Sequence, residues 1–407
     1  MRRVLLTATF VVAVGATASA QRFGPPEPRP RLAAGADTND AVAYYNYGVA
    51  RFDDDPKAAA SAFYWAARLN PNWGEPLYAR RAALITSNRV RLRNVMRDNG
   101  RFMQSDEMRR IDSLQFRALM LSPFLYRKLD RAMLVTYIKT EVSGNPREAS
   151  AELEYEINQY LHDAGPAMRG WLAYSDGDLP IALEYYALAL RSSHNKASIR
   201  LDRARIFAMQ NQVDSATAEF TRALDEMRKK DDKDLVIFYN SKALAEYSIG
   251  VLMEGADNPT AAREAYGRAL QEDLSYYPAH LKLGMLALGT NDTTTAMSEM
   301  ALAAQLAPDE PNIRYMNGYV LAASHHLDEA AGELSKAIEL EPYFALPYVL
   351  MGQVEEMRQH GKEAAAAYQK FLDHASVNDS QRDFASTRLS QIKEFLATAA
   401  AGKYSTP

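Results

Sequence analysis

The chain offers few residues whose types and spacing could support catalysis. Its seven histidines include one adjacent pair, His325-His326, but neighbouring side chains rarely point at the same metal ion. The acidic run Asp53-Asp54-Asp55 resembles the start of a calcium loop, yet the glycine and glutamate that such a loop needs at its sixth and twelfth positions are missing. The sequence has no H-E-x-x-H, G-x-S-x-G or phosphate-loop motif. We therefore expect no enzymatic activity, no catalytic residue, no metal site and no cofactor.

Small residues recur at a fixed step of 34 residues in the second half of the chain. Antiparallel helices that pack about 8–10 Å apart need small side chains where their backbones come closest. A proline that follows the second helix prevents the helix from continuing. A period of this length with two helical patterns in each unit indicates a helical solenoid. The recurring positions are Gly284, Gly318 and Gly352; Ala296, Ala330 and Ala364; Ala303 and Ala337; and Pro308 and Pro342.

The unit at 277–310 resembles the tetratricopeptide repeat (TPR) family. It follows that family's pattern at Gly284, Ala296, Ala303 and Pro308, with Met300 in place of the usual aromatic residue. The resemblance implies an all-α fold, a right-handed superhelical solenoid of antiparallel helix pairs. It also implies a function in holding other macromolecules, most often proteins or peptides.

The repeat frame extends from these units towards the N-terminus. It recurs around Gly170, Ala204 and Gly250, with twelve extra residues before Gly250, and an isolated unit surrounds Gly48. Residues 80–145 are either worn-down repeats or an inserted helical subdomain, and the sequence leaves both readings open. The sequence predicts a signal peptide at 1–20, a disordered Pro-rich tether at 21–38, an isolated N-terminal repeat at 39–73, a degenerate basic helical region at 74–160, a TPR array at 161–376 with an insertion near 229–242, a C-terminal capping helix at 377–398 and a tail at 399–407.

The first twenty residues have the form of an export signal. An arginine pair at 2–3 precedes an apolar stretch at 4–14, and the A-x-A sequence at 18–20 is typical of a cleavage site. The apolar stretch is too short for a stable bilayer anchor. The chain has no cysteine, which excludes disulfides and a lipid-modified cysteine. We expect an exported protein, periplasmic or extracellular, with no transmembrane segment after processing; an uncleaved N-terminal anchor is the alternative.

A basic segment between residues 80 and 131 interrupts the repeat frame. It holds 13 Lys and Arg against 5 Asp and Glu, although the whole chain has a net charge of −4. Arg89, Arg93 and Arg97 are four residues apart and would form one ridge on a helix. The segment is either a solvated face balanced by acidic neighbours or a docking face for an anionic surface, polymer or protein. Nucleic acid is not an expected partner of an exported chain.

In the resembled family, ligands lie along the concave face formed by helix A, the first helix of each repeat. The residues three before and one after its small residue point into this groove. Such a set with aromatic, Met and almost no charged side chains suits a protein or peptide partner. Alternatively, these side chains pack against neighbouring repeats, or the N-terminal half covers them. The residues, which we call the helix-A stripe, are Tyr247, Val251, Leu281, Met285, Tyr315, Tyr319, Val349 and Gln353.

Two classes of function follow from these patterns. The leading hypothesis is a non-enzymatic exported scaffold or chaperone-like adaptor that binds a protein or peptide in the concave groove. The alternative is a structural subunit of an envelope or oligomeric complex, docked through the arginine-rich helical face. Binding through the groove should depend weakly on salt, and binding through the arginine face should depend on it steeply. The sequence does not indicate an oligomeric state.

Overall fold

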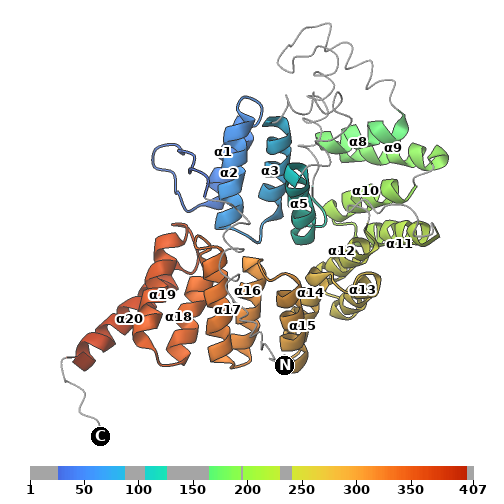
Figure 1. Cartoon of the computed structure of the whole chain (residues 1–407). Helices are drawn as coiled ribbons and strands as arrows, with labels where there is room; N and C mark the ends of the chain where they lie inside the picture. Colours follow the sequence, from blue (N-terminus) through green and yellow to red (C-terminus); the bar gives the residue numbers. More distant parts are fainter. Residues whose placement is uncertain (1–25, 88–105, 126–164, 194–195, 230–240, 401–407) are drawn as a thin grey trace, which may run out of the picture.

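The computed structural model describes residues 26–87, 106–125, 165–193, 196–229 and 241–400 (Figure 1). Within these stretches it contains α-helices and no β-strand, which confirms the predicted all-α class. The predicted signal peptide and most of the predicted insertion lie outside the described residues. The helices are α1 (Ala41–Arg51), α2 (Pro56–Leu69), α3 (Gly74–Ser87), α5 (Asp106–Leu121), α8 (Pro166–Asp176), α9 (Leu179–Ser192), α10 (Lys196–Met209), α11 (Val213–Lys229), α12 (Lys242–Gly255), α13 (Pro259–Glu272), α14 (Tyr277–Gly289), α15 (Thr293–Leu306), α16 (Pro311–Ala323), α17 (Leu327–Leu340), α18 (Leu346–Met357), α19 (Gly361–His374) and α20 (Arg382–Ala400).

The helices pack as successive pairs, and each pair stacks on the next along the chain (Figure 1). Helices A of the array are α8, α10, α12, α14, α16 and α18, and each is followed by its helix B. Helix B of one pair contacts helix A of the next, as in α15 with α16 and α17 with α18. Each pair therefore buries its apolar side against its neighbours, as expected of a solenoid.

The turn between helices A and B has the same backbone conformation in six pairs. One residue in each turn adopts a left-handed conformation, which ends helix A. The next residue often caps helix B: Asp178, Asn258 and Asp292 each accept a hydrogen bond from a backbone N–H three residues on. The turn residues keep the 34-residue step except for the one interval that contains the insertion, and they are Gly177, Asn211, Asp257, Asn291, His325 and Gln359.

The small residues of the frame lie where the two helices of a pair come closest. A Cβ atom added at Gly250 would meet the ring of Tyr266 at 2.3 Å. The same atom at Gly352 would meet the ring of Tyr368 at 2.6 Å. Ala262 and Ala364 on the facing helices are fully buried. The steric reason for the repeat pattern is therefore present in the structure.

Helix α20 packs on α19 and closes the array at its C-terminal end. Ala385, Leu389 and Ile392 face α18 and α19 in one buried cluster. The helix begins at Arg382, five residues later than the start of the predicted capping segment at 377–398. The residues before it bind the N-terminal part of the chain: the backbone N–H of Val377 donates to the Asp37 carboxylate at 2.8 Å.

The N-terminal repeat is isolated in sequence but not in space. Helix α3 packs on α2, and α5 packs on α3, so that α1, α2, α3 and α5 form one continuous stack. This order is the one that stacked solenoid helices take, and for residues 80–87 and 106–121 it favours worn-down repeats over an inserted subdomain. The remainder of the region from 80 to 145 lies outside the described residues, apart from a short stretch that follows α5.

This N-terminal stack lies against the second half of the array (Figure 1). Arg117 of α5 makes two hydrogen bonds to the Glu310 carboxylate at the start of α16, at 2.8 and 3.0 Å. Arg68 of α2 donates to Glu341, which follows α17, at 2.8 Å. Both pairs are largely buried. We call this contact between the N-terminal stack and the array the seam.

Residues 26–38, here called the arm, correct the prediction of a disordered tether at 21–38. Trp65 donates its indole N–H to the backbone carbonyl of Glu27 at 2.9 Å. The Arg29 guanidinium lies over the rings of Trp65 and Tyr343. Composition alone suggested a tether because the segment is rich in proline, but proline also lowers the entropy cost of binding in an extended form. Residues 21–25 lie outside the described residues.

Candidate partner-binding surface

The helix-A stripe lies on four consecutive A helices, α12, α14, α16 and α18. Each helix contributes two residues four positions apart, which places the two on the same face of the helix. Contacts between α14 and α16 and between α16 and α18 bring the A helices of neighbouring repeats together. The structure therefore joins the predicted residues into one row, but it exposes them very unequally.

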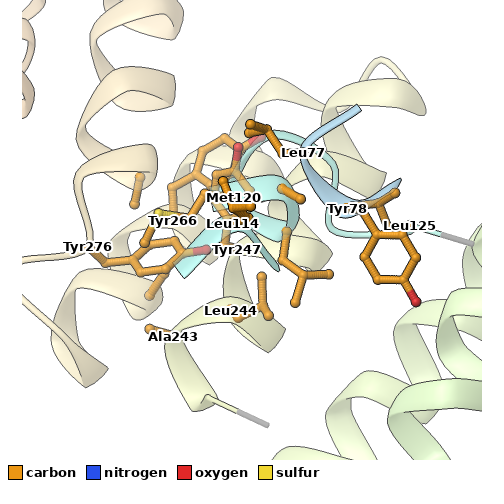
Figure 2. Close-up of a cluster of buried hydrophobic side chains, with 14 of the residues drawn as sticks. Leu77, Tyr78, Leu114, Met120, Leu125, Ala243, Leu244, Tyr247, Tyr266 and Tyr276 are labelled. Atoms are coloured by element: carbon orange, nitrogen blue, oxygen red, sulfur yellow. The ribbon is translucent and has the colours of Figure 1, made fainter. Parts of the chain in front are cut away.

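The α12 part of the stripe is covered by the chain itself. Tyr247 is only 4% exposed, and its ring lies 5.5 Å from the rings of both Tyr266 and Tyr276. The same buried cluster includes Leu77 of α3 and Leu114 of α5 (Figure 2). Burial raises the pKa of the Tyr247 hydroxyl far above its usual value, and the nearby Glu254 carboxylate adds to the increase. The prediction that Tyr247 faces a partner is wrong for this arrangement, because the N-terminal stack occupies its place.

Val251 belongs to the same covered region. It is partly buried and packs against the cluster that α3 and α5 complete. Val349 on α18 is buried as well, at 2% exposure, within the cluster that joins α18, α19 and α20. It is therefore also unavailable to a partner, since its neighbouring repeats enclose it.

The middle of the stripe remains accessible. Tyr319 on α16 is 40% exposed, and Tyr315 one turn before it is half-buried. The Tyr315 ring packs edge-on against Phe344 with 5.5 Å between centroids. Burial raises the pKa of the Tyr315 hydroxyl, and the proximity of Tyr319 adds to the effect. Tyr315 is thus fixed by its neighbours, whereas Tyr319 presents its ring to the solvent.

Three further residues extend this surface to the neighbouring helices. Leu281 and Met285 on α14 are half-buried and pack beside Met297 and Met316. Gln353 on α18 is half-buried too. None of the side chains in this surface carries a charge, and Met side chains adapt their shape to a ligand. We call this surface the open patch, and its members are Leu281, Met285, Tyr315, Tyr319 and Gln353.

The basic segment is neutralised in part by the chain itself. In its described portion, Arg81 pairs with Asp112 at 2.8 Å, and Arg117 pairs with Glu310 at the same distance. Arg80 at its beginning binds Glu27 of the arm at 2.8 Å. These pairs favour the interpretation of a basic face balanced by acidic neighbours. Arg89, Arg93 and Arg97 lie outside the described residues, so the arginine ridge stays a prediction.

The seam and the arm are structural features that the sequence does not reveal. Their members, such as Arg68 and Glu341, are separated by hundreds of residues, and no repeat pattern connects them. The charge asymmetry between the basic segment and the acidic remainder was the available signal. In the described part of the basic segment, the acidic partners belong to the same chain: Glu27 of the arm, Asp112 of α5 and Glu310 of the array.

The histidine pair lies in the turn between α16 and α17, as predicted. His325 takes the left-handed position with φ of 62°. His326 precedes α17 and lies 3.2 Å from the exposed Glu329 carboxylate. Among the described residues, no group of three potential ligands is placed to hold a metal ion.

The 34-residue step, the repeated turn and the close helix contacts together define a TPR-like α-solenoid. No protein-family model matches the chain, and no curated protein matches it. Several solved structures of TPR proteins resemble it over about half of its length. The TPR protein YrrB, described as having an unusual peptide-binding site, is 19% identical, with a TM-score of 0.40, and the match covers 50% of this chain and 98% of that one.

Two other structures give comparable values. PilW, a type IV pilus biogenesis factor, is 16% identical with a TM-score of 0.43, over 54% of this chain and 96% of that one. The C-terminal part of a TPR repeat-containing protein from Cytophaga hutchinsonii is 14% identical with a TM-score of 0.42, over 50% of this chain and 77% of that one. These likenesses concern the fold. Among the described residues, no helix is both long and apolar enough to cross a membrane.

Proposed function

We propose that this chain is a non-enzymatic, exported interaction scaffold or chaperone-like adaptor that binds a protein or peptide at the open patch. The observation that carries the proposal is the uncharged, partly exposed row on α14, α16 and α18, bounded on one side by a covered stretch of the same stripe. Tyr319 offers its ring at the centre of this row. Aromatic side chains at such positions often supply most of the binding energy of an interface.

The proposed location, periplasmic or extracellular, is supported by the form of residues 1–20 and by the absence of cysteine. It is tested by N-terminal sequencing of the protein from its native host. The proposal expects the mature chain to begin at Gln21. An intact Met1 on membrane-bound protein would contradict it.

The binding proposal is tested by capturing the partner with the full chain from native envelope extracts and then measuring its affinity for variants. Tyr319→Ala should weaken binding by at least about tenfold, since truncation of a central aromatic residue often costs about 2 kcal/mol. Leu188→Ala is the matched control, because Leu188 on α9 is equally exposed and lies far from the patch in sequence. The Leu188→Ala variant should bind the captured partner with the same affinity as the unmodified chain.

The alternative, a structural subunit docked through the arginine ridge, predicts the opposite pattern. Replacement of Arg89, Arg93 and Arg97 by Ser would then release the partner, and binding would weaken steeply with added salt. Tyr319→Ala would have no effect. That combination of results would reject binding at the open patch.

A further inference from the structure

The arm occupies a formed site on the seam that recognises specific side chains. The site, here called the arm site, consists of Ser61 and Trp65 on α2, Arg80 on α3, and Tyr343 between α17 and α18. It thus takes residues from both the N-terminal stack and the array. The contacts with the arm show which peptide chemistry it fits.

The first contact is with a carboxylate. Ser61 Oγ donates to Glu27 Oε2 at 2.7 Å, and Arg80 Nη2 donates to Glu27 Oε1 at 2.8 Å. Burial lowers the pKa of Arg80, and Glu27 opposes this effect. A buried guanidinium left without its anion is costly, so the site strongly favours an acidic side chain here. Arg80 Nε is buried and has no hydrogen-bond acceptor among the described residues.

The second contact is with a guanidinium two residues later. Arg29 lies 4.3 Å from the centre of the Trp65 ring and 4.9 Å from that of Tyr343. The negative faces of the two rings attract the positive guanidinium. The spacing of two residues fits an extended backbone, in which alternate side chains point the same way. Pro28 between them is exposed, in agreement with this alternation.

The site is held in shape by contacts other than the arm. The Trp65 and Tyr343 rings pack edge-on with centroids 4.9 Å apart, and Arg68 lies over both rings. The Glu341 carboxylate fixes Arg68 in turn. Because these side chains support one another, the site would keep its form when the arm leaves, and a preorganised site binds with less loss of entropy.

The arm itself has the features of a displaceable occupant. For the backbone groups of residues 26–32, one hydrogen bond is described: the Glu27 carbonyl accepts from the indole N–H of Trp65. Pro26, Pro28 and Arg31 are exposed. Leu32 of the arm also packs against the cluster of Tyr44, Tyr64 and Trp65. Because an open arm would leave Arg80 without its anion, exchange is favoured when a competing peptide supplies its own carboxylate.

We propose that the arm site is a peptide-recognition site for extended, proline-containing segments with a carboxylate and, two residues later, a guanidinium. Residues 27–30 are its intramolecular occupant, and a partner protein that carries the same arrangement displaces them. The site is separate from the open patch and does not depend on the function proposed for that patch.

The test uses a fluorescent synthetic peptide with the sequence of residues 26–34 and the full chain with Glu27→Ala and Arg29→Ala, which removes the two specific contacts of the arm. The peptide should bind this variant at least about tenfold more tightly than the unmodified chain, in which the tethered arm competes at an effective concentration on the order of millimolar. A peptide with Glu and Arg exchanged should not bind. Equal binding to both chains, or none to a folded variant, overturns the proposal.

Two further measurements make the result independent of the folding of that variant. Trp65→Phe in the same background keeps a ring but removes the indole donor, and should weaken peptide binding about two- to tenfold. On the unmodified chain, an excess of the peptide with Arg31→Gln, which trypsin does not cleave, should accelerate trypsin cleavage of the chain after Arg31, and the exchanged peptide with the same Arg31→Gln change should not. An unchanged cleavage rate overturns the proposal. A dimer of the unmodified chain that the peptide dissociates would assign the site to arm exchange between two copies instead.

Discussion

Tyr247 and Tyr315 occupy the same position in two repeats, yet their surroundings differ. Tyr247 on α12 is enclosed by α3 and α5, whereas Tyr315 on α16 borders a surface on which Tyr319 remains exposed. The repeat determines the direction in which each side chain points. Whether it meets solvent or protein is decided by a second part of the chain, which packs on one region of the array and not on the other.

The seam sets the boundary between the covered and the open region. Arg117 reaches Glu310 at the start of α16, the helix that carries Tyr315 and Tyr319 of the open patch. The hydrophobic contacts of α3 and α5 extend to α12, α13 and α14 and do not include α16. The two ion pairs therefore fix the stack at a defined place along the solenoid.

The largest expected effect comes from breaking the seam. Arg68→Ala would leave Glu341 buried without its partner, and losses of about 3–5 kcal/mol in the free energy of unfolding are typical for such changes. Burial already raises the pKa of Glu341 against the opposing effect of Arg68, so the remaining carboxyl would be still harder to ionise. Urea denaturation followed by circular dichroism measures the effect.

Arg109→Ala is the matched control for this change. Arg109 also pairs with a carboxylate, that of Asp106, but both side chains are highly exposed. Its removal should leave the urea midpoint unchanged. If Arg68→Ala and Arg109→Ala lower the free energy of unfolding equally, the buried ion pair between Arg68 and Glu341 does not stabilise the fold more than an exposed pair does.

The next prediction compares the close contacts between paired helices in the covered region and in the open region. Gly250→Ala should cost about 1–3 kcal/mol, because its Cβ would press on Tyr266. Tyr266 cannot move aside easily, since its hydroxyl donates to Glu254 at 2.6 Å. In the open region, Gly318→Ala should cost less, because the flexible Leu334 side chain can adjust. Thermal unfolding of both variants gives the order.

Gly267→Ala controls for the change of residue type. Gly267 lies inside α13, and no atom lies within 4 Å of an added Cβ. This substitution should therefore stabilise the chain by about 0.4–1 kcal/mol. A destabilising result would mean that replacing a helical glycine is costly even without a close contact, so that the losses at Gly250 and Gly318 could not be assigned to Tyr266 and Leu334.

A smaller effect concerns the attachment of the arm at low pH. Burial alone would raise the pKa of Asp37, but hydrogen bonds from the backbone N–H groups of Asn39 and Val377 lower it below the usual 3.8. A lowered pKa in the folded state means that the stabilisation is present above pH 3.8 and is lost as the pH falls through the folded value. The stability difference between the unmodified chain and Asp37→Ala should therefore shrink between pH 6 and pH 3.

Much of the array was predictable because its determinants are local. The small residues, the turn and the capping aspartates repeat within 34 residues, and each has a steric or hydrogen-bonding reason that acts within one helix pair. The position of Tyr319 on the exposed face followed from the same frame. These features depend on neighbours in sequence, and a periodic pattern reveals them.

The burial of Tyr247 and the binding of the arm could not be read in the same way. Both depend on contacts between residues far apart in sequence, such as Arg68 with Glu341 and Arg29 with Tyr343. A proline-rich segment without apolar periodicity predicts a tether, because its composition does not reveal a binding site that other parts of the chain form. The covering of one region by another is a tertiary property.

The most direct test of the covered and open regions is nitration of tyrosine side chains with tetranitromethane, read for each residue by mass spectrometry. Tyr319, at 40% exposure, should react rapidly. Tyr247 should remain protected, because it is buried and its raised pKa disfavours the reactive phenolate. In Arg68→Ala, where the seam is weakened, Tyr247 should become reactive before the helices unfold. Equal rates for Tyr247 and Tyr319 in the unmodified chain would contradict the covering of α12 by the N-terminal stack.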